Sequence, residues 1–155
     1  MTFTPEQRSA YLKATTICSR GETSSFDILE KLRKWGLEET DAKEIIEQLK
    51  SEKYLDDERF ARAYVKDKFR FNHWGRQKIA YMLSSKRISR EIQEAAFEEI
   101  EVENYSEQLV KLIKAKEKTI KSDDPFDKRN KLMRFAMARG FEADKIYKAF
   151  KELGI

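Results

Sequence analysis

A chain of 155 residues is long enough for one ordinary domain or for several small units, and 40% of its residues are hydrophobic while 39% are charged. It has no apolar run of 18 residues and no signal-peptide pattern, so we expect a soluble, cytoplasmic protein with no membrane contact. A single cysteine, Cys18, excludes an internal disulfide, and the lone His73 leaves too few ligands for a zinc site.

Helix-start and helix-stop signals divide the chain into about nine segments. Thr4-Pro5-Glu6-Gln7 is a capping box with proline at the first helical position, and Asp124-Pro125 repeats the proline signal. Further N-cap candidates are Ser24, Thr40, Ser89 and Asn104, and candidates for a left-handed C-cap are Gly36 and Gly140. The predicted helices cover residues 5–18, 25–35, 41–52, 57–71, 75–86, 90–101, 105–120, 125–139 and 143–153.

Three stretches of the chain repeat one another. "KLRKWGLEETDAKEIIEQL", "MLSSKRISREIQEAAFEEI" and "FAMARGFEADKIYKAFKEL" align without a gap. Gly36, Arg87 and Gly140 then coincide, and the next residue is apolar in all three copies. Chance agreement of helical periodicity is the alternative. We therefore predict an all-α fold, an elongated array of three tandem three-helix repeats over residues 1–53, 54–103 and 104–155.

The segment "LDDERFARAYVKDKFR" opens with two adjacent carboxylates, which pose the question of a catalytic or metal-binding pair. A structural role explains them fully: Asp56 is an N-cap, Asp57 lies in the positive first turn, and Leu55 and Phe60 have the spacing of a hydrophobic staple. A catalytic or metal pair would need further acids or histidines nearby, and the flanking sequence supplies none.

No phosphate-binding loop, dinucleotide fingerprint, zinc motif or nucleophile elbow occurs in the sequence. His73 has no serine, cysteine or aspartate partner at a known motif spacing, so we expect a loop residue. The two tryptophans, Trp35 and Trp74, are expected in the core. We therefore predict no enzymatic activity, no catalytic residues, no metal and no cofactor.

Positive charge is concentrated in the middle of the chain. Residues 61–90 contain nine bases and one acid, whereas residues 38–60 sum to −5 and residues 91–107 sum to −7. At 100° per residue, four bases of the predicted helix 57–71 lie opposite its apolar side: Arg59, Arg62, Lys66 and Arg70. We define the basic ridge as Arg59, Arg62, Lys66, Arg70, Arg76, Lys78, Lys86, Arg87 and Arg90. We predict that it contacts an acidic protein surface or nucleic-acid phosphates, an ordinary solvated surface being the alternative for each single residue.

The order of these motifs resembles the RecX family of regulators of the bacterial recombinase RecA. The Asp-Asp-x-x-Phe/Tyr-Ala motif of that family is matched by Asp56, Asp57, Phe60 and Ala61. The motif that follows it is matched by Gly75, Ile79, Leu83, Lys86 and Ile88. Arg87 stands where the family has glycine, so a left-handed turn there would be strained by about 1 kcal/mol or more. Trp74 stands where the family has lysine, which puts a lysine contact there in doubt.

The resemblance implies three three-helix repeats and a regulator that performs no reaction. Such a protein binds the RecA filament on single-stranded DNA and inhibits its ATPase, strand exchange and filament extension, in recombination, DNA repair and the SOS response. We expect a monomer. A stand-alone helical nucleic-acid-binding protein and an adaptor scaffold with another partner are the alternatives.

Overall fold

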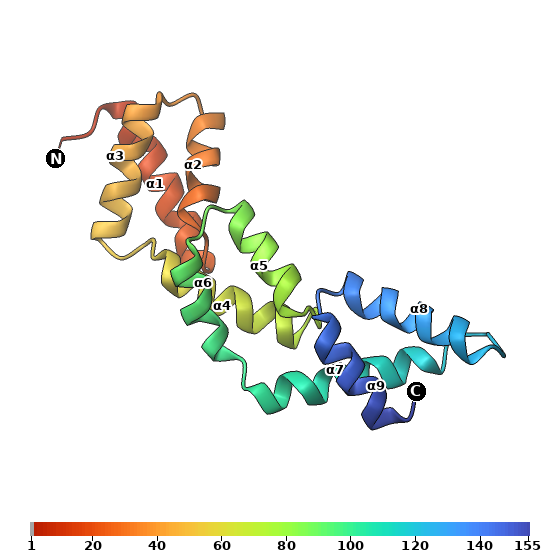
Figure 1. Ribbon diagram of the computed structural model, residues 1–155. Helices are drawn as coiled ribbons and strands as arrows, with labels where there is room; N and C mark the ends of the chain where they lie inside the picture. The colour runs from red at the N-terminus through yellow and green to blue at the C-terminus, as the bar shows by residue number, and fades with distance from the viewer. Residues whose placement is uncertain (1) are drawn as a thin grey trace.

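The computed structural model describes residues 2–155, and that part of the chain folds into helices with no strand (Figure 1). The α-helices are α1 Pro5–Arg20, α2 Ser25–Lys34, α3 Glu39–Ser51, α4 Asp57–Arg70, α5 Arg76–Ser85, α6 Arg90–Ala96, α7 Val102–Glu117, α8 Pro125–Ala138 and α9 Ala143–Leu153. A short 3-10 helix, Phe97–Glu99, extends α6. The predicted all-α fold class is confirmed.

The predicted helix starts are correct at most positions and wrong at two. The side chains of Thr4, Ser24, Asp56, Ser89 and Asp124 cap their helices as expected. Thr40 and Asn104 do not, because α3 begins after Glu38 and α7 begins after Glu101. Neither glutamate makes a side-chain cap hydrogen bond. Acidic residues in the first turns of these two helices stabilise their starts instead, because a negative charge is favourable near the positive end of the helix dipole.

The internal repeat is visible in the backbone. Gly36, Arg87 and Gly140 all have positive φ angles, of 88°, 58° and 94°. In each copy the next amide donates to a carbonyl five residues earlier: Leu37 to Leu32 (3.2 Å), Ile88 to Leu83 (3.1 Å) and Phe141 to Ala136 (3.2 Å). This is the hydrogen bond of a Schellman C-cap. Arg87 therefore adopts the same left-handed turn as Gly36 and Gly140, and its side chain makes that backbone conformation strained.

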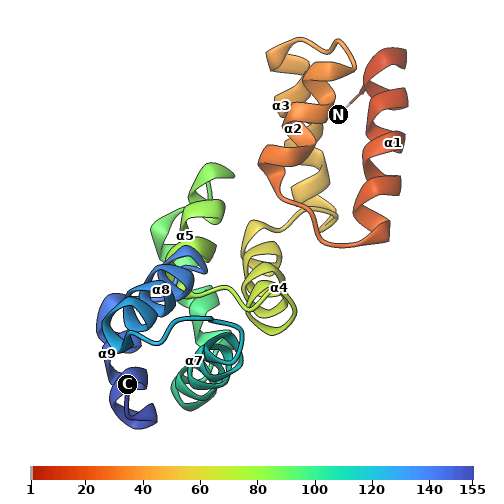
Figure 2. The ribbon, with the colours of Figure 1, turned by 90° about the vertical axis from the view of Figure 1, so that its right-hand side faces the viewer.

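The helices form an elongated row, with α1–α3 at one end, α4–α6 in the middle and α7–α9 at the other end (Figures 1 and 2). The first bundle has a core of its own, which includes Ile28, Ile45 and Leu55. The second core is continuous from Phe60 to Phe150 and joins the two remaining bundles. The division at residues 53 and 103 stays a prediction.

The core assignment corrects two expectations. Leu55 packs in the first core and Phe60 in the second, so the predicted staple between them is wrong. The chain leaves the first bundle at Leu55, and this side chain remains behind in that bundle. Trp35 is 37% exposed and lies outside both cores, whereas Trp74 packs against the second core as expected.

The junction between the middle and C-terminal bundles is a backbone contact. The Gly75 amide donates to the Arg139 carbonyl (2.7 Å), and the Gln77 amide donates to the Gly140 carbonyl (2.9 Å). A Cβ on Gly75 would lie 2.5 Å from the Phe141 nitrogen, closer than such atoms approach. Glycine is therefore required where α5 meets the turn after α8.

The junction between the first and middle bundles is made by polar side chains. Arg59 pairs with Glu22 (2.6 Å) and Lys86 with Asp27 (2.7 Å). Asp57 accepts a hydrogen bond from the Ser25 amide (2.8 Å). The two junctions thus rest on different interactions, although the bundles that they join are copies of one unit.

Candidate partner-binding surface

The two adjacent aspartates each cap a different helix. Asp56 Oδ1 accepts from the Arg59 amide (3.0 Å) at the start of its own helix, α4. Asp57 Oδ1 accepts from Ser25, the first residue of α2 in the neighbouring bundle. Within residues 2–155 no group of acids, histidines or cysteines is arranged to hold a metal ion. The capping role predicted for Asp56 is confirmed, and the reach of Asp57 to α2 is a new finding.

The structure shows which of the nine residues of the basic ridge are neutralised within the molecule. Five of them are in ion pairs: Arg59 with Glu22, Arg62 with Glu58 and Glu99, Arg76 with Glu142, Lys86 with Asp27, and Arg90 with Glu94. Ion pairs that water can still reach add little stability, usually below about 1 kcal/mol each when they are exposed. They do cancel the local positive charge, so these five cations attract an acidic partner less than the sequence suggests.

Of the other four ridge residues, two lie over aromatic rings and two do not. Lys78 Nζ lies 4.6 Å from the ring centroid of Trp74, and the Arg87 guanidinium lies 5.1 Å from that of Phe26. Lys66 and Arg70 are exposed, and neither forms an ion pair within the described part of the chain. Within residues 2–155, these last two make neither an ion pair nor a cation–π contact.

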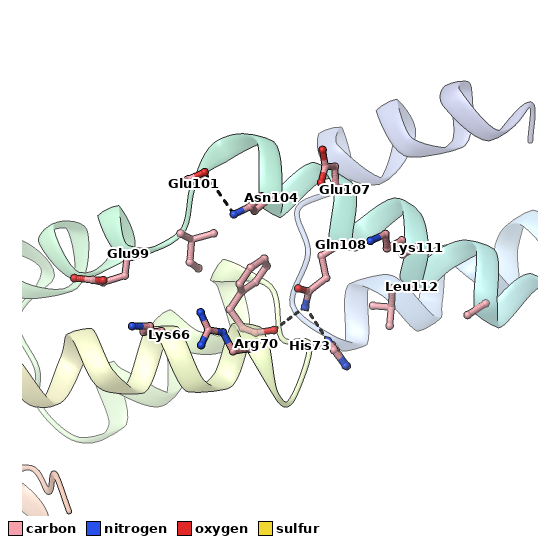
Figure 3. A pocket seen from close by; sticks show the side chains of 13 residues that line it. Lys66, Arg70, His73, Glu99, Glu101, Asn104, Glu107, Gln108, Lys111 and Leu112 are labelled. Carbon is pink, nitrogen blue, oxygen red and sulfur yellow. Dashed lines mark hydrogen bonds between the residues drawn. The ribbon is translucent and has the colours of Figure 1, made fainter.

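Lys66 and Arg70 line a groove of about 530 Å³ between α4 and α7 (Figure 3). Lys111 of α7 adds a third cation to the lining. The remaining charged residues of the lining are Glu99, Glu101 and Glu107, and its apolar residues include Phe69, Ile100 and Leu112. A groove with both signs of charge and an apolar lining suits a protein partner whose surface is partly apolar and carries charges of opposite sign at the matching positions.

Gln108 ties the end of α4 to α7 inside this groove (Figure 3). Its Nε2 donates to the Phe69 carbonyl (2.6 Å) and lies 2.9 Å from His73 Nδ1. His73 itself has a φ of 56° in the turn after α4. The prediction that His73 is a loop residue is confirmed, and Gln108 holds that loop against the groove.

Tyr105 links the groove helix α7 to the junction between the second and third bundles. Its hydroxyl donates to Glu142 and accepts from the Arg76 amide (3.0 Å). Burial, reinforced by the hydrogen bond to Glu142, raises the pKa of Tyr105 far above its ordinary value. The Arg76 guanidinium lies 4.0 Å from the Tyr105 ring centroid and 3.6 Å from Glu142. Arg76 therefore helps to hold the second and third bundles together through its contacts with Tyr105 and Glu142.

Replacing Tyr105 by phenylalanine is expected to destabilise the protein by about 1–3 kcal/mol, because Glu142 and the Arg76 amide both lose their partner at a buried position. Chemical denaturation followed by circular dichroism measures the change. Tyr147→Phe is the matched control, since Tyr147 is 53% exposed. Its effect should stay within about 0.5 kcal/mol. Equal stability of the two variants would show that the buried hydroxyl contributes nothing.

Sequence reasoning missed several residues of these surfaces. Lys111 and Gln108 follow Lys66 by more than forty positions and reach the groove only because α7 packs beside α4 (Figure 3). Lys68 was left out of the ridge because it lies about 200° around α4 from Lys66. The Lys68 ammonium lies 5.0 Å from the ring centroid of Trp74, six residues further along the chain.

The molecule is thus a helical-repeat protein with a charged groove between α4 and α7. Two family models match it: the second three-helix domain of RecX over residues 56–96 and the third over residues 103–150. The chain belongs to the RecX family, as the resemblance in its motifs implied. No helix in residues 2–155 is long and apolar enough to cross a membrane.

Individual relatives agree with this assignment. A regulatory protein RecX of Clostridium perfringens is 33% identical over 120 residues, which cover 76% of this chain and 56% of the relative. Another, of Legionella pneumophila, is 27% identical over 93% of this chain and 94% of its own length. The crystal structure of RecX from Lactobacillus salivarius superimposes with a TM-score of 0.85 at 25% identity, covering 96% of this chain and 97% of that one. The chain spans little more than half the length of the first curated relatives that it matches.

Proposed function

We propose that this protein regulates the bacterial recombinase RecA. It binds the RecA filament on single-stranded DNA, inhibits its ATPase, strand exchange and filament extension, and thereby modulates recombination and DNA repair in the cytoplasm. It catalyses no reaction of its own. Membership of the RecX family supports this function, and so does the elongated row of three bundles, which can lie across successive protomers of a filament (Figure 1).

The observation that carries the proposal is the groove between α4 and α7. Lys66 and Arg70 remain exposed and without ion pairs there, while most other cations of the ridge are neutralised within the molecule. Unpaired cations at the rim of an interface act chiefly on the association rate, through attraction that salt screens. We therefore assign the contact with the filament to the α4 side of this groove.

The test is a single-stranded-DNA-dependent ATPase assay of the cognate recombinase with increasing amounts of this protein. Lys66→Glu combined with Arg70→Glu is expected to raise the concentration for half-inhibition at least about tenfold at low salt, and less at high salt. Arg76 is left unchanged, because its reversal would also break the ion pair with Glu142.

The matched control reverses Lys148 and Lys151, two exposed lysines on one side of α9, and should inhibit like the wild type. Equal inhibition by both double variants at every salt concentration would contradict the role of the groove. A wild-type protein that leaves ATP hydrolysis unchanged at stoichiometric amounts would contradict the proposed function itself.

A further inference from the structure

The two junctions between the bundles use the same elements, although their contacts differ. In each, the left-handed turn after the second helix of one bundle packs on the first turn of the second helix of the bundle before it. At the first junction, Lys86 of such a turn pairs with Asp27 of α2 (2.7 Å). At the second junction, the Gln77 amide of α5 donates to the Gly140 carbonyl (2.9 Å). The three bundles are therefore stacked head to tail by one repeated geometry.

The first turn of α8 has the residues that form the docking site on α2. The sequence is SFD at positions 25–27 and PFD at positions 125–127, and each triplet opens its helix after a capping side chain. In α2 both side chains are occupied. The Phe26 ring centroid lies 5.1 Å from the Arg87 guanidinium, and Asp27 holds the ion pair given above. The start of α8 thus presents a second copy of this docking site.

Within residues 2–155, no other bundle occupies this second site, which lies at the opposite end of the row from the first bundle (Figure 1). Phe126 is 74% exposed. Asp127 pairs only with Lys131 of its own helix (3.0 Å), and such pairs are weak. Asp123 and Asp124 precede the ring, and neither forms an ion pair in the described chain. The start of α8 is therefore an exposed aromatic ring among carboxylates.

The turn between α2 and α3 is the third left-handed turn of this kind, and it lies at the other end of the row (Figure 1). A Cβ on Gly36 would meet no atom within 4 Å, whereas Gly140 is in close contact with α5. Trp35 is 37% exposed, and Lys13 Nζ lies 5.3 Å from its ring centroid. Lys34 is exposed and forms no ion pair within residues 2–155. This turn offers an aromatic ring with positive charge.

We propose that the start of α8 binds the α2–α3 turn of a second copy of this chain, so that copies associate head to tail. Trp35 of one copy meets Phe126 of the next, and Lys34 pairs with Asp127, which repeats the ring and ion-pair contacts of the first junction. Opposite charge on the two surfaces and continuity with the internal stacking favour a second copy over an unrelated basic protein. The contact is small, so we expect monomers in dilute solution. It involves no recombinase and is independent of the proposed function.

The test is sedimentation equilibrium of the protein from about 10 µM to about 1 mM in about 50 mM salt. The weight-average mass is expected to rise with concentration past the dimer, because a contact between two different surfaces leaves both ends open to further copies. Lys34→Glu and Asp127→Lys should each weaken association at least about fivefold. Combined in one chain, they restore opposite charges across the contact, and this double variant should associate more tightly than either single variant.

Matched variants separate this contact from general stickiness. Phe126→Ala should weaken association at least about fivefold, whereas Phe71→Ala removes another exposed ring (70%) and should not. Asp144→Lys in the first turn of α9 and Lys148→Glu should also have no effect. The proposal is overturned if the mass stays that of the monomer at about 1 mM, if it levels off at the dimer, or if the charge-swapped double variant is no tighter than the single variants. No recombinase is present, so these results leave the ATPase assay to decide the proposed function separately.

Discussion

Replacing Gly140 by alanine is expected to lower the free energy of unfolding by about 4 kcal/mol and to loosen the third bundle from the second. A Cβ there would lie 2.5 Å from the Lys78 nitrogen, a backbone atom of α5 that cannot move without displacing the helix. Overpacking of this kind costs about 3 kcal/mol, and the left-handed backbone of Gly140 adds about 1 kcal/mol of strain. Gly75→Ala should show the overpacking alone.

The chain supplies a matched control for each of these glycines. Gly36 has nearly the same backbone angle as Gly140, with a φ of 88°, but no atom within 4 Å of an added Cβ. Gly36→Ala should therefore cost only the strain, about 1 kcal/mol. Gly21 has an extended backbone and the same open space, so Gly21→Ala should be neutral within about 0.5 kcal/mol and matches Gly75→Ala.

Denaturant titrations of the four alanine variants measure these differences. Equal losses at Gly36 and Gly140 would mean that backbone strain alone matters and that the close contact with α5 does not. Equal losses of unfolding free energy at Gly21 and Gly75 would mean that the close contact of Gly75 with the backbone of Gly140 and Phe141 does not matter either.

The second large effect is expected on the cooperativity of unfolding. The first bundle has its own core and meets the rest of the protein through polar contacts, whereas the other two bundles share one core. Stability in repeat proteins is the sum of unit and interface contributions, and a polar interface contributes little. We therefore expect two unfolding transitions, one for the first bundle and one for the remainder.

The two tryptophans report these transitions separately, since Trp35 belongs to the first bundle and Trp74 packs against the second core. Ile28→Ala and Ile79→Ala both truncate a fully buried isoleucine, one in each core. Each should cost about 2–5 kcal/mol. Ile28→Ala should shift only the Trp35 transition, followed in a Trp74→Phe background, and Ile79→Ala only the Trp74 transition, followed in a Trp35→Phe background. If either substitution shifted both transitions equally, the protein would be one cooperative unit.

Most of the secondary structure could be predicted from the sequence, because its signals are local. Capping side chains such as Thr4 and Asp56 act within three residues, and helical periodicity repeats within one turn. The alignment of Gly36, Arg87 and Gly140 also located three equal turns, one of them built on a strained arginine. The starts of α3 and α7 were misplaced because no capping side chain marks them.

The candidate site could be predicted only in part. A helical wheel shows that Lys66 and Arg70 point away from the apolar side of α4, and both are exposed as expected. It cannot show that Arg59 meets Glu22 or that Lys86 meets Asp27, because those partners lie 37 and 59 residues away in another bundle. For the same reason, the groove wall contributed by α7 and the cations around Trp74 were not expected.

The sequence by itself determined an all-α chain with a repeated three-helix pattern, a basic centre and a family resemblance, since each of these follows from residue order over short distances. The tertiary structure decided which cations stay unpaired, which bundles share a core and why Gly75 and Gly140 are glycines. The physical reason is that neutralisation and close backbone contact depend on which helices are neighbours in space. Local sequence patterns do not encode how three similar bundles stack on one another.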